Sequence, residues 1–393
     1  MMQELVVGYE LYRLTHDPLT LGLVGLAEAV PYMALVLIGG HWADRYNRRL
    51  LMTASLATMV PVSALIWWIL AGLTDQVSGW SLAALYGCIA LNGLARGIYS
   101  PSASATAPLL VPEEQVPNQA TWSSIAWQSG AMFGPVAGGF ILQHFGISAT
   151  MLGVMFVFAG CTILSFLIIP IRHVPPKPHQ AMGESLREGF LFVWQEKIIL
   201  YSISLDLFSV LFGGVVAILP VFALDVLHTD ANGLGILRMS ASVGAVLTSL
   251  VLTRYSPLRH PWRNLLWAVV GFGLTTIAFG FSQWFWVSAA MLFLTGAFDA
   301  VSVVIRSTIL QTVPPLSVQG RVLSINGIFI SASNELGAFE SGVAARVLGA
   351  IPSVLMGGAL TLVLVAGVAA RTRDLLHVRL GRRLSGHEKE SDV

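Results

Sequence analysis

The sequence carries little charge: only 11% of its 393 residues are Asp, Glu, Lys or Arg, against about 25% in soluble domains. Cysteine is also scarce, since Cys88 and Cys161 are the only two and both lie in apolar runs. No His or Cys cluster has metal-ligand spacing, and no glycine-rich loop resembles a nucleotide site. These absences argue against a soluble protein, a disulfide framework, a bound metal or cofactor, an ATP-driven machine and an enzyme.

Long apolar runs take the place of charge, with 55% hydrophobic residues and a mean hydropathy of +0.73. A helix needs roughly 20 mainly apolar residues to cross a bilayer, and helices satisfy their own backbone there. We therefore predict an all-α membrane protein with about 12 transmembrane helices, the first of which is too short. The expected spans are residues 2–14, 19–38, 50–73, 81–110, 118–142, 147–171, 198–224, 233–253, 264–281, 285–313, 319–348 and 354–370.

A polar, proline-rich stretch at residues 172–197 divides the chain into halves at 1–171 and 198–370, followed by a basic tail at 371–393. The halves repeat: residues 91–96 correspond to 294–299, and Asp17 corresponds to Asp230. Two related six-helix halves are typical of transporters, with the substrate site near the bilayer midplane. The same repeat places the start of the first span before Met1, so we expect a first helix truncated at its N-terminus. A naturally half-length helix is the alternative.

Orientation follows from Lys and Arg in the short loops, which favour the cytoplasmic side. The charged loop at residues 39–49, the 172–197 stretch and the tail are rich in these residues, whereas the opposite loops carry mainly His and Asp. This asymmetry predicts a multi-pass protein of the inner membrane with both termini in the cytoplasm.

The charged loop contains Gly40, Asp44, Arg45, Arg48 and Arg49 at the spacing of the loop motif between spans two and three of the major facilitator superfamily. The chain resembles that family here, although Trp42 replaces a Leu and Asn47 replaces a Gly. Asn tolerates a left-handed turn better than other non-glycine residues, so we expect such a turn at Asn47.

A second motif lies in the fifth span, where Gly130, Gly134, Pro135, Gly138 and Gly139 match the superfamily's antiporter pattern at every fixed position. The resemblance implies that this glycine face packs against the eighth span and seals the outward-closed state. Tight helix packing without a directional role is the alternative.

Arg96 stands where the family keeps a buried arginine in its fourth span, but Tyr99 and Ser100 replace the Gln-Gly that normally follows. The overall pattern is most similar to the branch that contains the enterobactin exporter and the macrolide efflux proteins.

For the charged loop, the resemblance implies a gate contact in which Asp44 faces the positive end of a second-half helix near Gln319. Such a contact is worth roughly 1–2 kcal/mol. The alternative is a topology signal, in which the arginines only hold the loop in the cytoplasm. The corresponding second-half loop keeps Arg254 and Arg259 but has no acid.

Ionisable residues within spans are costly and therefore usually functional or paired. Our candidates for proton coupling, in order, are Glu28, Asp299, Asp206 and Glu335. Arg96 and Arg306 are the basic residues among the candidates for the cavity. A direct pair between Asp299 and Arg306, two turns apart, is the plain structural alternative for Asp299.

Together these patterns predict a secondary transporter that exports a small amphipathic or apolar compound of drug or siderophore type by proton antiport. We expect alternating access, a proton gradient as the only energy source, and a monomer with no nucleic-acid partner. An importer or lipid flippase of the same fold and a non-transporting membrane sensor are the alternatives.

Overall fold

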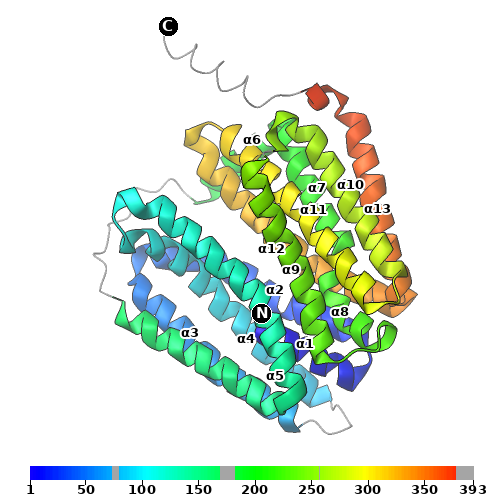
Figure 1. The fold of residues 1–393 in the computed structure, drawn as a ribbon. Coiled ribbons are helices and arrows are strands. Elements are labelled where there is room, and N and C mark those ends of the chain that lie inside the picture. Colours follow the sequence, from blue (N-terminus) through cyan, green and yellow to red (C-terminus); the bar gives the residue numbers. More distant parts are fainter. Residues whose placement is uncertain (73–78, 169–181, 256, 378–393) are drawn as a thin grey trace. The chain divides into compact units, whose positions relative to one another are not determined.

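The computed structural model describes the chain except residues 73–78, 169–181, 256 and 378–393, and the described residues form helices without strands (Figure 1). Short 3-10 or π turns connect several of them. The helices are α1 (Met2–Thr15), α2 (Pro18–Arg45), α3 (Arg48–Gly72), α4 (Gly79–Thr106), α5 (Val116–Leu167), α6 (Met182–Gln195), α7 (Lys197–Gly213), α8 (Leu219–Val221), α9 (Ala231–Arg254), α10 (Pro261–Phe281), α11 (Phe285–Thr312), α12 (Leu316–Leu348) and α13 (Ala350–Arg371).

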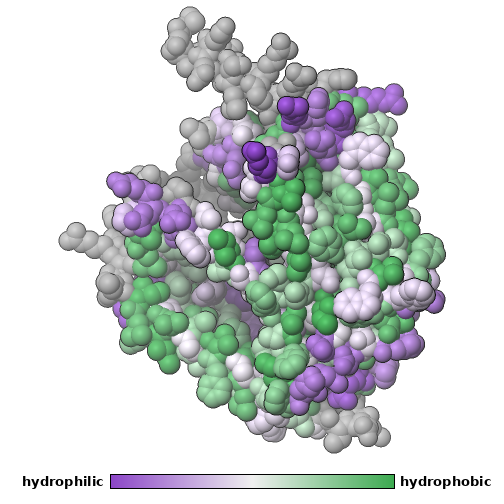
Figure 2. All heavy atoms as spheres, in the orientation of Figure 1, coloured by the Kyte–Doolittle hydropathy of each residue, from purple (hydrophilic) through white to green (hydrophobic). Residues whose placement is uncertain are grey.

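Nine helices in the described part of the chain are long and apolar enough to cross a membrane. One of them, α5, contains two successive spans because the chain bends at Gly146, whose φ of 76° favours glycine. Apolar side chains cover much of the visible helix surface (Figure 2), and Phe156 and Trp286 are about three-quarters exposed, at 75% and 74%. Exposed apolar surface on this scale is what a lipid-facing protein requires, so the all-α membrane fold is confirmed.

The helix boundaries on both sides of the charged loop differ from the sequence prediction. The charged loop is not a ten-residue turn, because α2 continues to Arg45 and only two residues separate it from α3. Asn47 is also not left-handed. Its side chain instead accepts hydrogen bonds from the backbone N–H groups of Arg49 and Leu50, at 3.1 and 3.4 Å, and so caps α3 as Asn does at many helix starts.

The seventh span is broken rather than continuous. α7 ends at Gly213, and the chain continues through the turn Val215–Ile218, the short α8 and a π-helical segment, Phe222–Val226. Gly213, Gly214 and Pro220 explain the break, since glycine and proline are poor residues for a helix interior. Discontinuous helices of this kind are common near the sites of transporters.

The internal repeat is visible in the local structure. Asp17 accepts a hydrogen bond from the N–H of Leu19 at 3.0 Å at the start of α2, and Asp230 accepts one from Gly233 at 2.9 Å at the start of α9. A left-handed histidine precedes each, His16 and His228. The two sequence halves therefore begin this helix in the same way.

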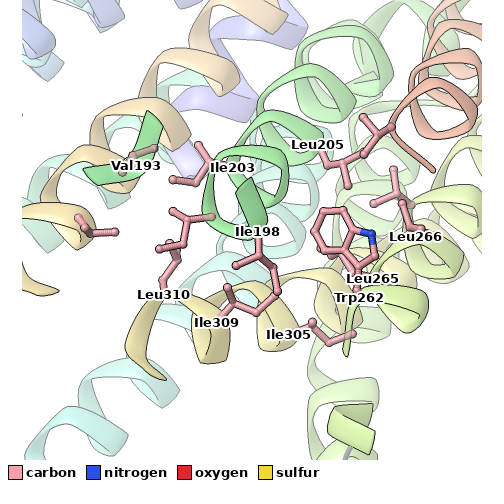
Figure 3. Packing of buried hydrophobic residues seen from close by; sticks show 14 of the residues in the cluster. Val193, Ile198, Ile203, Leu205, Trp262, Leu265, Leu266, Ile305, Ile309 and Leu310 are labelled. Carbon is pink, nitrogen blue, oxygen red and sulfur yellow. The ribbon is translucent and has the colours of Figure 1, made fainter. Parts of the chain in front are cut away.

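The chain groups into two compact units: Met1–Pro178 with Ala217–Met239, and His179–Val216 with Ser240–Val393. These units are defined by packing and not by the repeat, so they do not test the predicted sequence halves. The halves at residues 1–171 and 198–370, with the linker and the tail, therefore stay a prediction. In the second unit, buried side chains such as Ile198, Trp262 and Ile305 form one core between α7, α10 and α11 (Figure 3). This core fixes the helices that carry Asp206, Asp299 and Arg306.

Candidate functional site

The first unit contains a close backbone contact between α5 and α9. A side-chain carbon at Gly139 would overlap the carbonyl oxygen of Ala231, and one at Gly235 would lie 2.8 Å from the carbonyl oxygen of Pro135. Both neighbours are backbone atoms, which cannot move aside without separating the helices. The expected contact between the fifth and eighth spans is therefore present at Gly139 and Pro135.

The other motif glycines do not take part in that contact. A carbon at Gly134 would lie 3.1 Å from the Cβ of Met1, one at Gly138 would lie 3.0 Å from the Cγ of Met2, and Gly130 has open space around it. This corrects the expectation that the face shared by these three glycines packs on the eighth span. Residues four apart share a face, and Gly139 lies on the neighbouring one.

The start of the chain is joined to the same second-half segment by polar contacts. The Tyr12 hydroxyl donates a short hydrogen bond to Asp225 in the π-helical segment, and Arg238 on α9 pairs with Glu4 at 3.4 Å. Gly8 lies within ordinary contact distance of Pro220. Together with the α5–α9 contact, these bonds hold Ala217–Met239 against the first-half helices.

Replacing Tyr12 by Phe is expected to release the π-helical segment, because Asp225 then loses its hydroxyl donor. A hydrogen bond to a charged group contributes roughly 1.5 kcal/mol or more, so amide exchange in Phe222–Val226 should become about tenfold faster. Hydrogen–deuterium exchange with mass spectrometry measures this. Tyr255→Phe, at a side chain that is 73% exposed, is the control, and equal exchange in both variants would remove the role assigned to Tyr12.

Glu28 on α2 forms an ion pair with Arg96 on α4, and the Arg96 guanidinium lies 5.5 Å from the centre of the Tyr32 ring. The helices approach closely here, since a carbon at Gly93 would overlap the backbone of Glu28. The two side chains remain 19% and 46% exposed, respectively. The pair is therefore only partly buried.

Asp206 on α7 pairs with Arg306 on α11, and both side chains are buried, at 9% and 5% exposure. The alternative of a direct Asp299–Arg306 pair is therefore wrong in this structure. Asp299 forms no ion pair with any described residue, but it lines the same small pocket as Asp206. The spacing of Asp299 and Arg306 along α11 would allow them to pair. Packing of α7 against α11 instead brings the carboxylate of Asp206 to Arg306.

The loop motif is only partly described. The surroundings of Gly40 and the side chains of Asp44 and Arg45 lie outside what the structure describes, so the Asp44 gate contact stays a prediction. Arg48 donates to the carbonyl oxygen of Ala105 at 2.9 Å, and Arg49 donates to that of Phe166. These carbonyls lie at the C-terminal ends of α4 and α5, where cations are favourable.

The remaining candidate, Glu335, is half-buried on α12, and Glu340 is half-buried on the same helix. Sequence reasoning did not assign roles to Tyr12, Asp225, Glu4 or Ser209. Tyr12 and Asp225 lie 213 positions apart, which is also the spacing between Asp17 and Asp230 in the repeat. This shared spacing was the signal in the sequence that could have pointed to the contact between Tyr12 and Asp225.

Comparison with known proteins agrees with this architecture. The family model of the Major Facilitator Superfamily matches residues 5–338. The enterobactin exporter EntS of Citrobacter koseri is 25% identical over 377 residues, which cover 94% of this chain and 88% of that protein. EntS of Shigella boydii is 25% identical over 368 residues, covering 91% and 86%.

Solved structures share the fold at low identity. For the nucleoside transporter NupG the TM-score is 0.71 at 13% identity, and the match covers 94% of this chain and 96% of that one. A bacterial homologue of the iron transporter ferroportin, in an inward-facing state, has a TM-score of 0.71 at 15% identity, covering 94% of each. The xylose transporter XylE from E. coli has a TM-score of 0.66 at 12%, covering 93% of each.

Proposed function

Since the chain belongs to the Major Facilitator Superfamily, and is thus a multi-pass membrane transporter of small molecules, we propose that it exports a small amphipathic compound of siderophore type. The proposed energy source is the proton gradient, with no bound cofactor. The proposed location is the inner membrane, with both termini in the cytoplasm and the monomer as the working unit.

The observation that carries the direction of transport is the glycine motif of α5. It matches the antiporter pattern at every fixed position, and its Gly139 rests on the α9 backbone. A backbone-on-backbone contact is tight in the closed arrangement and depends on the absence of a side chain. The substrate class is supported by relatives named enterobactin exporters, which match over nearly the whole chain.

Export is tested with a strain that lacks this gene and the same strain carrying it on a plasmid. Secreted and intracellular siderophore-type metabolites are compared by mass spectrometry during iron limitation. The proposal expects the compound to accumulate inside the deletion strain and to return to the medium on complementation. Uptake of that compound from the medium by the complemented strain would instead establish an importer.

Proton coupling is assigned first to Glu28, whose ion pair with Arg96 stays partly exposed. A carboxylate bound to a guanidinium can exchange that cation for a proton when its surroundings change during the cycle. Glu28→Gln keeps the shape of the side chain but removes the exchangeable proton. We expect the variant to lose the dependence of export on the pH gradient.

The measurement uses everted membrane vesicles, with the pH gradient followed by a fluorescent dye while substrate is added. Wild-type vesicles should release protons on substrate addition, and Glu28→Gln vesicles should not. Glu340→Gln, which alters another half-buried carboxyl, is the control and should behave as wild type. Unchanged coupling in Glu28→Gln would transfer the role to another candidate carboxylate, beginning with Asp299.

A further inference from the structure

A small pocket lies within the second unit, between α7, α10 and α11. Its cavity volume is about 10 Å³, which is about what one water molecule or small ion needs. Its lining combines four oxygen-bearing side chains with three apolar ones. The lining residues are Asp206, Ser209, Val210, Val269, Phe272, Asp299 and Ser302.

The charges at this pocket do not cancel. Asp206 is neutralised by Arg306, and both are buried. The second carboxylate, Asp299, forms no ion pair with any residue in the described part of the chain. The residues that α10 contributes to the lining, Val269 and Phe272, are apolar and add no charge. Asp299 is half-buried, and an uncompensated charge that is partly removed from water is costly, so the pocket favours a guest with a single positive charge.

A buried hydroxyl in the lining is also unsatisfied. Ser209 is 5% exposed, and its Oγ has no hydrogen-bond partner. Two other buried serines of this unit donate to a carbonyl of their own helix: Ser202 to Ile199 at 2.9 Å and Ser353 to Ala350 at 2.8 Å. An orphaned polar atom in a buried site calls for an explanation, and a bound cation supplies one.

We propose that this pocket binds one sodium ion, with oxygen ligands from Asp206, Asp299, Ser209 and Ser302. Carboxylate and hydroxyl oxygens suit hard cations, and one positive charge balances the free carboxylate. A divalent ion would leave an excess charge in the same apolar surroundings. The assignment concerns the resting protein and does not depend on which compound it transports or in which direction.

The position of the pocket gives the ion a structural consequence. Ser209 lies one turn before Gly213, where α7 ends, and a carbon at Gly213 would press on the ring of Phe272. A bound ion joins this broken helix to α11 through Asp299 and Ser302. Sodium should therefore stabilise the second unit against unfolding, because a ligand that binds only the folded state raises its stability.

The test uses the purified full-length protein in detergent, without substrate or gradient. Melting is followed by tryptophan fluorescence in sodium, potassium or choline chloride at equal ionic strength and constant pH, and binding of radioactive sodium is measured in parallel. The expected result is a melting temperature that rises saturably with sodium but not with choline. Asp299→Asn should lose the response and the bound isotope, and Ser209→Ala should bind about tenfold more weakly.

Two matched controls separate the site from general effects. Ser202→Ala removes a buried hydroxyl of α7 that bonds its own helix, and Glu340→Gln removes a carboxylate of α12 outside the pocket. Both should keep the wild-type response to sodium. Equal melting in sodium and choline, equal stabilisation by potassium, or full sodium binding by Asp299→Asn would each overturn the proposal. None of these outcomes bears on export, which is measured separately in cells.

Discussion

Replacing Gly139 by alanine is expected to abolish export, although the change adds a single methyl group. That methyl would overlap the carbonyl oxygen of Ala231 and lie 3.3 Å from the Cα of Asn232. Because both are backbone atoms of α9, relief requires the two helices to move apart. The closed arrangement of this end should then be lost, and a transporter that cannot close on one side cannot complete alternating access.

The matched control is Gly130→Ala on the same helix, where a new methyl group meets nothing within 4 Å. Both changes gain the same intrinsic helix propensity, up to about 1 kcal/mol, so their difference isolates the contact with α9. Export by the complemented deletion strain and the amount of protein in the membrane are measured together. Gly130→Ala should export normally, and normal export by Gly139→Ala at normal abundance would show that the contact has no directional role.

Gly235→Ala tests the other side of the same contact. Its methyl group would lie 2.8 Å from the carbonyl oxygen of Pro135 and 3.2 Å from the Cα of Val136. This overlap is smaller than that at Gly139, so export should fall but not disappear. If the separation of α5 and α9 sets the rate of export, wild type should export fastest, Gly235→Ala more slowly and Gly139→Ala least.

Replacing Arg306 by leucine is expected to cause the largest loss of stability among the charged residues. The Asp206–Arg306 pair is almost fully buried, and removal of one partner from a buried pair costs about 3–5 kcal/mol. In this case two carboxylates, Asp206 and Asp299, would remain in the same pocket without a cation. The protein should melt at a lower temperature in detergent and reach the membrane in smaller amounts.

Asp206→Asn should be milder than Arg306→Leu. Arg306 then loses its ion-pair partner, but Asp299 remains in the pocket beside position 206, so one cation and one carboxylate are left there and their charges balance. The double variant should recover part of the loss of Arg306→Leu, since it removes one of the two uncompensated carboxylates. Thermal melting of all three proteins gives the coupling between the positions.

The control for Arg306→Leu is Arg321→Leu. Arg321 also forms an ion pair, with Glu188, but the two side chains are 23% and 54% exposed. Exposed pairs contribute roughly 0–1 kcal/mol, so this change should shift melting only slightly. Similar losses in the two variants would mean that burial does not set the strength of the Asp206–Arg306 pair.

Much of the fold could be predicted from the sequence because the bilayer leaves few alternatives. An apolar run of membrane length must satisfy its own backbone hydrogen bonds, and the helices found here follow the predicted runs closely. The observed helices differ from the predicted ones where charged residues or glycines, and not hydropathy alone, determine where a helix ends. The helix α2 continues past its apolar run to Arg45, and the seventh apolar run breaks at Gly213 and Gly214.

The candidate site was harder to predict. The helical period shows on which face of its helix a residue lies, but it does not show which other helix packs against that face. Glu28 and Arg96 were both recognised as costly membrane charges, yet nothing in their spacing indicated that they pair. Arg306 had a plausible carboxylate on its own helix, and packing gave it a different one on α7. A contact between the glycine motif and α9 was expected, but it is made by Gly139 and not by the face of Gly130, Gly134 and Gly138.

Taken alone, the sequence determined the class of this protein: an all-helical membrane transporter of repeated halves, because bilayer-length apolar runs and recurring local motifs are written along the chain. Only the tertiary structure decided which charges pair and which stay unpaired, since ion pairs form between helices whose relative positions depend on packing. It also assigned the α9 contact to Gly139, because close approach of two backbones depends on the absence of a side chain at that one position.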